Sequence, residues 1–426
     1  MRILYLIHGH ERFSKGGAEA AAFSLFHSIK NLPDCDCWIL AAFPTVNDAI
    51  PFGALQSADK YGREYIIGAQ CEYFYLKSID IAAIKPALAR LLDEVQPDII
   101  HLHHFINFGI DILPLMQTLM PTAKIIVTLH EYLALCLNNG QMVTTKRLSL
   151  CKEPSPLSCL SCFPDKNQNN IFLRLSYAAT TLKGVDQLIS PSHFLMERYK
   201  QSGINHPRFE CIENGLPIDI HQSENENEHE RSKLASKNSL NRFSFFGQIN
   251  QYKGLLILLK AVAMLKQSDV TNFLVIINGA NLEMQPMDFQ KSFGDLLEQA
   301  GDLVLMAGSY NKDELKSRMI HSDWTILPSI WWENSPVVIQ ESFYFKRPVI
   351  GSNIGGISEK IRGKGGIEFE VANPLSLANT IESCINNDAL HQQLQQQMQE
   401  PFTAEHCAQR HRQLYLDLMN DIPASP

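Results

Sequence analysis

Short apolar runs alternate with helix-length amphipathic stretches along the whole chain. Such runs are the length of strands, and continuous apolar strands between helices are typical of parallel sheets that are covered on both faces. In the first half, the predicted strands are residues 3–7, 37–41, 99–102, 124–129, 187–189 and 208–212. In the second half, they are residues 242–246, 273–277, 303–306, 324–327 and 348–350.

The amphipathic stretches between these strands predict helices. In the second half, the predicted helices are residues 255–266, 289–300, 312–322, 336–346 and 375–386. A stretch with almost no apolar residue, 222–241, predicts a polar linker or loop between the two halves. The sequence therefore predicts an α/β protein with an N-terminal Rossmann-like domain over residues 1–221 and a second such domain over 242–400, facing a central cleft. A C-terminal helix is predicted within residues 401–426. In open parallel sheets, ligands bind beyond the carboxyl ends of the strands, where functional residues are expected.

Composition and charge narrow the classes of protein. Of the 426 residues, 45% are hydrophobic and 19% charged, which excludes disorder for most of the chain. The net charge of −8 argues against a nucleic-acid partner and limits membrane association to peripheral contact. No run reaches the roughly 18 apolar residues of a membrane-spanning helix, and the first residues do not form a signal peptide. We therefore expect a cytoplasmic protein, at most peripheral to the inner face of the membrane, with its ten cysteines reduced or bound to metal.

The most informative segment follows the strand predicted at residues 324–327. There Ser335 is a good helix N-cap and Pro336 suits the first helical position, so a helix is expected to start at this point. A helix N-terminus attracts phosphate or sugar oxygens. Glu333 is expected in an exposed loop above the helix and Glu341 about two turns into it, so that one carboxylate could hold sugar hydroxyls and the other ribose hydroxyls. The alternative is a surface acid and a helix-face acid without a ligand.

Two further loops follow predicted strands. Gly16 and Gly17 come after the first strand, where paired glycines let the backbone approach a ligand, although such a pair also forms ordinary turns. Lys253 lies between the strand at 242–246 and the next helix, where its charge could stabilise a departing diphosphate without a divalent metal. An exposed lysine before a helix is the alternative.

Together these segments resemble the large retaining glycosyltransferase family 4, which has the GT-B fold. The resemblance covers nearly the whole chain, and Glu–x7–Glu is its most specific element. The matching motifs are Gly16-Gly17-Ala18-Glu19, Asn214-Gly215, Gly247–x5–Lys253-Gly254 and Glu333–x7–Glu341.

The resemblance implies roles for individual residues. Glu333 would contact the donor sugar, His130 would lie beside that sugar, and Lys253 would stabilise the leaving group. Gln248 stands where the family usually has arginine, so half of the phosphate-neutralising pair is missing. No catalytic divalent metal is expected, and the C-terminal helix resembles the family's crossover helix, which returns to the first domain. The implied substrate-binding residues are Gly16, Gly17, Asn214, Gln248, Asn334, Ser335 and Glu341.

Four cysteines lie close together in a Cys-rich insertion, residues 136–162. Cys159 and Cys162 form a CxxC pair, half of a tetrahedral thiolate site, which Cys136 and Cys151 could complete. A structural zinc could order this loop, which has little apolar content of its own. Four reduced loop thiols are the alternative.

The sequence thus predicts a retaining hexosyltransferase. It would take a nucleoside-diphosphate sugar as donor and a glycan or lipid-linked acceptor, in surface polysaccharide or lipopolysaccharide biosynthesis. A nucleotide-sugar epimerase of the same fold is one alternative. Another is an inactive nucleotide-sugar-binding subunit of a glycan assembly complex, which the missing arginine makes more credible.

Overall fold

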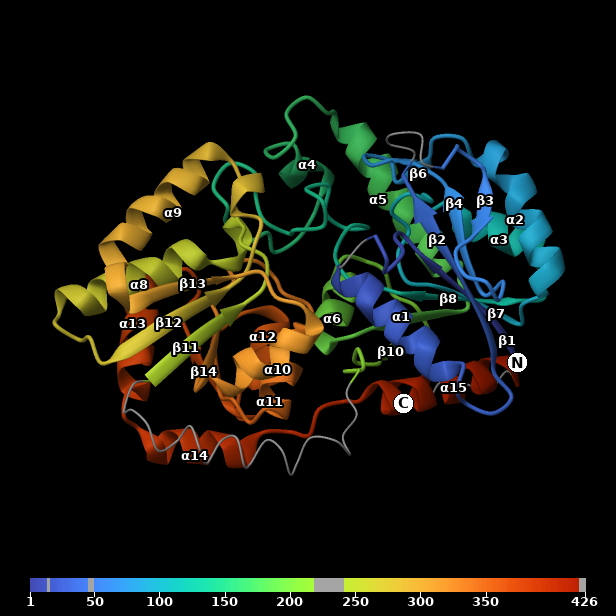
Figure 1. The fold of residues 1–426 in the computed structure, drawn as a ribbon. Coiled ribbons are helices and arrows are strands. Elements are labelled where there is room, and N and C mark those ends of the chain that lie inside the picture. Colours follow the sequence, from blue (N-terminus) through green and yellow to red (C-terminus); the bar gives the residue numbers. More distant parts are fainter. Residues whose placement is uncertain (14–15, 45–49, 218–240, 421–426) are drawn as a thin grey trace. The chain divides into compact units, whose positions relative to one another are not determined.

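The computed structural model divides the chain into two compact α/β units (Figure 1). It describes residues 1–13, 16–44, 50–217 and 241–420. Unit 1 comprises Met1–Pro217 and Phe402–Pro426, whereas unit 2 comprises Ile218–Pro401. The predicted linker at 222–241 and the predicted boundary after residue 221 lie almost wholly outside the described residues.

Unit 1 is built on an eight-stranded sheet with the order β10-β9-β8-β7-β1-β2-β4-β3. All neighbouring strands are parallel except β3 and β4. The strands are β1 (Arg2–Ile7), β2 (Asp36–Phe43), β3 (Leu55–Ser57), β4 (Glu64–Gly68), β7 (Ile99–Leu102), β8 (Lys124–Thr128), β9 (Gln187–Ser190) and β10 (Phe209–Cys211). A separate hairpin consists of β5 (Cys71–Glu72) and β6 (Lys77–Ser78).

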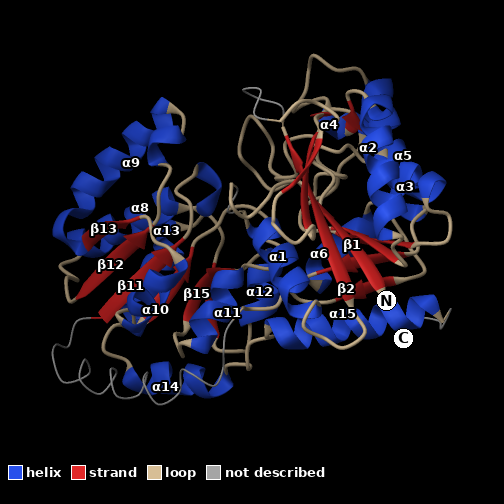
Figure 2. Cartoon of the chain, turned by 45° about the vertical axis from the view of Figure 1, so that its right-hand side comes forward, coloured by secondary structure: helices blue, strands red, loops and turns tan. Residues whose placement is uncertain are grey.

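Helices cover the sheet of unit 1, as Figure 2 shows. The described helices are α1 (Gly17–Ile29), α2 (Ile81–Val95), α3 (Ile112–Leu119), α4 (Pro156–Cys159), α5 (Gln168–Lys183), α6 (His193–Gln201) and α15 (Ala404–Met419). Phe23 and Phe26 of α1 are buried in one core cluster with Ile3 and Ile39 of the sheet. Because this face is closed by aromatic side chains from α1, the position of that helix over β1 and β2 is fixed by burial.

The last described helix, α15, belongs to unit 1 although it follows unit 2 in the chain. It packs alongside α1 (Figure 1), and Tyr415 is fully buried in the core of this unit. The backbone N–H of Leu216 donates to the carbonyl of Phe402, and that of Ala404 donates to the carbonyl of Leu216. A Cβ on Gly215 would lie 2.6 Å from the Cα of Ala404, so only glycine fits where α15 begins.

Unit 2 holds a six-stranded parallel sheet with the order β13-β12-β11-β14-β15-β16. Its strands are β11 (Asn241–Phe246), β12 (Phe273–Asn278), β13 (Val304–Gly308), β14 (Trp324–Leu327), β15 (Val349–Ser352) and β16 (Gly366–Phe369). Its described α-helices are α8 (Leu255–Gln267), α9 (Met287–Ala300), α10 (Lys312–Ile320), α11 (Val337–Tyr344), α12 (Gly355–Ile361), α13 (Pro374–Cys384) and α14 (Asp388–Gln397). Short 3₁₀ turns are η2 (Gln251–Lys253), η3 (Leu282–Met284) and η4 (Gly301–Leu303).

The structure confirms each predicted strand, with ends that move by one or two residues, and confirms the five predicted helices of the second half. It adds strands β3, β4, β5, β6 and β16, and in unit 2 helices α12 and α14, which the sequence pattern did not predict. Within the described residues, the helices are all too short or too polar to cross a membrane.

Replacing Gly215 by alanine tests the close approach of α15. The added methyl group would meet backbone of Ala404 and the Cβ of Cys407 within 3 Å, so we expect a loss of roughly 1–3 kcal/mol of unfolding free energy in urea. Gly184→Ala is the control, because its Cβ would find no atom closer than 3.4 Å. Equal stability of the two variants would contradict this account of Gly215.

Candidate functional site

In unit 2, the structure brings together two residues that the sequence placed in separate loops. The Nζ of Lys253 lies 2.6 Å from Oε1 of Glu333. The same carboxylate oxygen accepts hydrogen bonds from Oγ of Ser329 and from Nε1 of Trp331, both at 2.8 Å. Glu333 is buried, with 6% of its surface exposed, which corrects the expectation of an exposed loop. Its carboxylate can be buried because three donors compensate for the lost hydration.

Backbone packing explains why these loops meet. A Cβ on Gly254 would lie 1.7 Å from the carbonyl oxygen of Pro328, so glycine lets the start of α8 touch the loop after β14. Gly254 also has φ +73°, a conformation that favours glycine. The N–H of Ile330 donates to the carbonyl of Tyr252 at 2.9 Å. Both loops follow the carboxyl ends of neighbouring strands, β11 and β14, where parallel sheets bind ligands.

The start of α11 differs from the prediction. Pro336 is the N-cap, the helix begins at Val337, and neither Ser335 nor Pro336 caps it through a side chain. The backbone of Pro336 is extended at ψ 113°, which delays the helix by one residue. Among the described residues, nothing forms a hydrogen bond with the buried Oγ of Ser335. The loop is held instead by α12, since the N–H of Gly356 donates to the carbonyl of Glu333 at 2.7 Å.

Glu341 is the fifth residue of α11, so it lies nearer to the helix start than the two turns predicted. Burial raises the pKa of Tyr310 above its ordinary value, and the charge of Glu341 raises it further. The guanidinium of Arg318 lies 5.5 Å from the centre of the Tyr310 ring. Arg318 also donates to Oδ1 of Asn278 at the end of β12. No sequence pattern predicted Tyr310 and Arg318 near Glu341, although Tyr310 follows β13 in the same sheet as β12.

The remaining residues predicted in unit 2 lie in the same loops. Gln248 is exposed in the loop after β11, and Asn334 is partly exposed next to Glu333. A Cβ on Gly356 would overlap the carbonyl oxygen of Asn334, at 1.5 Å, so α12 approaches this loop through glycine.

In unit 1, the paired glycines begin α1. A Cβ on Gly16 would lie 2.2 Å from the carboxylate of Glu19, whereas one on Gly17 would meet no atom within 4 Å. Glu19 is 3% exposed, and its Oε1 lies 3.2 Å from Nε2 of His8. Gly16 thus makes room for a buried carboxylate of the same motif, a contact that spacing alone could not reveal.

His130 follows β8, as predicted, and is part of a group of histidines at the carboxyl ends of β1, β7 and β8. Its Nε2 lies 3.1 Å from Nδ1 of His103, and the two rings stack at 5.4 Å. The ring of His103 lies 4.3 Å from that of His101. His101 contacts the Tyr415 hydroxyl at 2.6 Å through Nδ1 and the Thr128 hydroxyl at 2.7 Å through Nε2.

Burial keeps these histidines neutral. It lowers the pKa of His130 to about 3 and that of His411, on α15, to about 4. Burial also lowers the pKa of His101, His103 and His104 well below the ordinary value. The opposite shift occurs next to His130, since burial raises the pKa of Glu131 to about 8. The group therefore offers neutral hydrogen-bonding partners at neutral pH.

Asn214 lies partly exposed after β10, and its neighbour Gly215 has the packing role described above. The four cysteines of the insertion lie near one another. Burial raises the pKa of Cys136 to about 11, with smaller contributions from Cys151 and Cys159. Among the described residues, however, no group of three His, Cys, Asp or Glu side chains is arranged to hold a metal ion.

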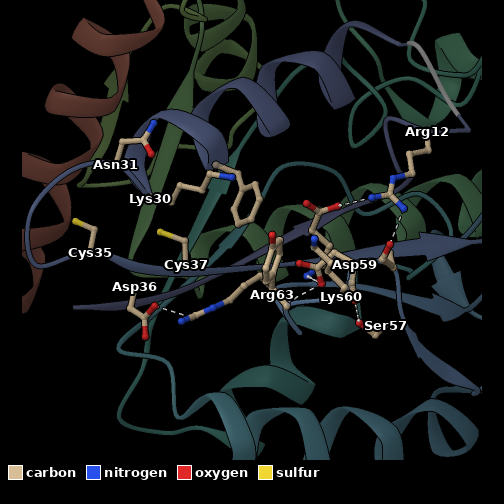
Figure 3. Close-up of a pocket in the computed structure, with 14 residues that line it drawn as sticks. Arg12, Lys30, Asn31, Cys35, Asp36, Cys37, Ser57, Asp59, Lys60 and Arg63 are labelled. Carbon is tan, nitrogen blue, oxygen red and sulfur yellow. Dashed lines mark hydrogen bonds and ion pairs between the residues drawn. The ribbon is translucent and has the colours of Figure 1, made fainter.

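A cavity of about 920 Å³ opens in unit 1 beside α1 (Figure 3). Arg63, which pairs with Asp36, contributes to its lining, as does Lys30 at the end of α1. None of the predicted site residues lines this cavity. We therefore place the candidate site at the side chains that converge at the strand ends, and not in this cavity.

The neutral histidines predict how stability depends on pH. Their pKa values are lower in the folded state than the ordinary 6.5, so the unfolded chain binds more protons between about pH 4 and 6.5. Stability should therefore fall as pH is lowered through this window. Glu131 has the opposite effect on stability, because its pKa in the folded state is raised to about 8. The five histidines with a lowered pKa outnumber this one carboxyl group, so their effect should dominate.

Urea unfolding between pH 7.5 and 5 measures this dependence. His411→Asn keeps a donor for the carbonyl of Cys407, which Nδ1 of His411 contacts at 2.8 Å, and removes one titrating group. We expect its slope of unfolding free energy against pH to be smaller by up to about 1.4 kcal/mol per pH unit. Identical slopes for the variant and the unchanged chain would contradict the neutral state of His411.

Two family models match this chain. A family model described as Glycosyltransferase Family 4 matches residues 55–220, and one described as Glycosyl transferases group 1 matches residues 226–400. The chain is 25% identical over 211 residues to lipopolysaccharide 1,2-N-acetylglucosaminetransferase of Salmonella typhimurium. That match covers 48% of this chain and 55% of the relative, so the chain matches little more than half the length of that protein.

Two solved structures share the fold over almost the whole chain. HepE of Anabaena, in complex with UDP and glucose, matches with a TM-score of 0.66 and 17% identity, covering 97% of this chain and 99% of that one. Sucrose-phosphate synthase of Thermosynechococcus elongatus matches with a TM-score of 0.70 and 15% identity, covering 99% and 100%. Because the two family models together match about four fifths of its residues, the chain belongs to the group 1 and family 4 glycosyltransferase families, with the two Rossmann-like domains of the GT-B fold.

Proposed function

We propose that the chain is a retaining hexosyltransferase. It transfers a hexose from a nucleoside-diphosphate sugar to a glycan or lipid-linked acceptor in the synthesis of surface polysaccharide or lipopolysaccharide. The bond between the anomeric carbon and the diphosphate oxygen breaks, and the diphosphate leaves with the electron pair. The acceptor oxygen bonds to the same face of the sugar, and its proton passes to the departing diphosphate. Support for the acceptor class comes from the Salmonella relative, whose name is lipopolysaccharide 1,2-N-acetylglucosaminetransferase.

One observation carries the proposal, namely the unequal use of the two oxygens of Glu333. Oε1 takes all three hydrogen bonds, from Lys253, Ser329 and Trp331, which fix the side chain in one orientation. Among the described residues, Oε2 of Glu333 accepts no hydrogen bond. A fixed carboxylate with one remaining oxygen is suited to accept hydrogen bonds from the hydroxyls of a sugar.

Lys253 supports the departure of a diphosphate. It lies at the end of η2, 2.6 Å from the carboxylate, and its side chain is 26% exposed. An ammonium group that is already held in place can stabilise charge on a leaving phosphate at little cost of reorganisation. The family usually has an arginine and a lysine at these two positions. In this chain the first position holds Gln248, which is neutral and exposed, so Lys253 is the one cation of the pair.

A panel of UDP-, GDP- and ADP-sugars tests the proposal, beginning with UDP-glucose because HepE was crystallised with UDP and glucose. Free nucleotide together with transferred sugar of unchanged anomeric configuration supports a retaining transferase. Inversion of a sugar centre without transfer indicates the epimerase, and binding without reaction indicates the inactive subunit. Either of these results would overturn the proposal.

Glu333→Gln tests the carboxylate itself. The amide can still accept from Ser329 and Trp331, so the fold should remain, but the charge that binds sugar hydroxyls is lost. Charged hydrogen bonds contribute about 1.5–3 kcal/mol, so the transfer rate should fall roughly 10- to 100-fold. Glu298→Gln, on the exposed side of α9, is the matched control and should transfer normally. Near-normal transfer by Glu333→Gln would remove Glu333 from the site.

We also propose that Cys136, Cys151, Cys159 and Cys162 bind one structural zinc. The pKa of Cys151 is raised by burial and by the charges of Cys159 and Cys162, so these thiols lie within electrostatic range of one another. Closing a tetrahedral site would require the loop side chains to move, because they do not form one as they stand.

Elemental analysis of reduced, freshly purified protein should find about one zinc per chain. Cys159→Ser should release it and loosen the insertion, because hydroxyl groups are poor zinc ligands. Cys384→Ser, at a buried thiol of α13 in unit 2, is the control and should keep the metal. Protein without metal would favour four reduced loop thiols.

A further inference from the structure

The hydrogen bond between His103 and His130 has only two arrangements of protons when both rings are neutral. In the first, Nδ1–H of His103 donates to Nε2 of His130. In the second, Nε2–H of His130 donates to Nδ1 of His103, whose own proton must then be on Nε2. The 3.1 Å contact is the same in both, so the surroundings of His103 decide between them.

The other ring nitrogen of His103 decides the choice. Nε2 of His103 is buried and has no hydrogen-bond partner among the described residues. The second arrangement would leave an N–H group there without an acceptor, and buried N–H groups without partners are rare and costly. In the first arrangement this nitrogen carries only a lone pair. The proton of His103 is therefore on Nδ1, and the shared hydrogen bond runs from His103 to His130.

We propose that His103 is a positioning residue that holds His130 as the Nδ1–H tautomer. With Nε2 accepting from His103, neutral His130 carries its proton on Nδ1 and donates from that nitrogen. This inference rests on the proposed function and on the role that the family resemblance implies for His130, beside the donor sugar. A hydrogen-bond donor with a fixed tautomer and no charge suits a sugar hydroxyl or phosphate oxygen.

The surroundings hold His103 in this role. Its ring packs against His101 at 4.3 Å and against Tyr5 at 5.8 Å, and His101 is fixed through both of its nitrogens. The charged or titrating groups that interact with His130 are His8 after β1, Glu19 on α1 and His411 on α15, together with His101, His103 and His104 at the end of β7. Of these, Glu19 places its Oε1 3.2 Å from Nε2 of His8.

Nitrogen NMR of protein labelled with ¹⁵N-histidine tests the tautomer without any substrate. Long-range ¹H–¹⁵N correlations show which ring nitrogen is protonated, and the signals missing from His130→Gln identify His130. We expect a protonated Nδ1 and an unprotonated Nε2 for His130 at pH 7.5. Protonation of His130 on Nε2 in the unchanged chain would overturn the inference.

Two variants of His103 separate positioning from packing. His103→Asn can place an amide N–H near the position of Nδ1 and should keep the tautomer, with kcat/KM for the nucleotide sugar within about threefold of the unchanged chain. His103→Leu removes the donor, so His130 should shift to Nε2–H and kcat should fall about tenfold or more.

Equal effects of the two variants, or an unchanged tautomer in His103→Leu, would contradict the role of His103. A chain that transfers no sugar contradicts the proposed function alone, because the NMR experiment on the unchanged protein still decides the tautomer.

Discussion

The candidate site of unit 2 depends on the burial of one carboxylate. A buried Glu333 without partners would be strongly destabilising, so Lys253, Ser329 and Trp331 must all reach the same oxygen. Their convergence in turn requires the loops after β11 and β14 to touch, which the glycine at 254 permits. The ion pair therefore depends on the backbone contact between the two loops. A change that separates the loops would leave the carboxylate of Glu333 without Lys253.

In contrast to the ion pair of unit 2, the strand ends of unit 1 carry buried histidines. Its strand ends carry imidazole rings that are too buried to be charged, and they satisfy one another and nearby hydroxyls as neutral groups. Such a network has fixed directions of donation, since each ring nitrogen is either a donor or an acceptor. Hydrogen bonds thus orient the imidazole rings although the rings are neutral. In unit 2, by contrast, an ion pair orients Glu333 and Lys253.

The regular elements could be read from the sequence because they are continuous apolar runs. β7 and β14 were predicted to the residue for that reason, whereas β16 begins with Gly366 and carries Glu368, so its pattern is too weak. The site was predicted only in part. Motif spacing found Glu333 and Lys253 but could not show that they form an ion pair. Side chains such as His103 and Ser329 have no motif, and only their contacts across the fold identify them.

The return of α15 to unit 1 has a consequence for synthesis of the chain. Unit 2 is continuous, so all of its strands are available once residue 401 has been made. Unit 1 lacks its last helix until then, and with it the Tyr415 hydroxyl that contacts His101 at 2.6 Å. Of the two units, unit 1 is made first but completes its core last. The surface that α15 later covers stays exposed while the whole of unit 2 is synthesised. During this interval, chaperones and proteases can reach the incomplete core of unit 1.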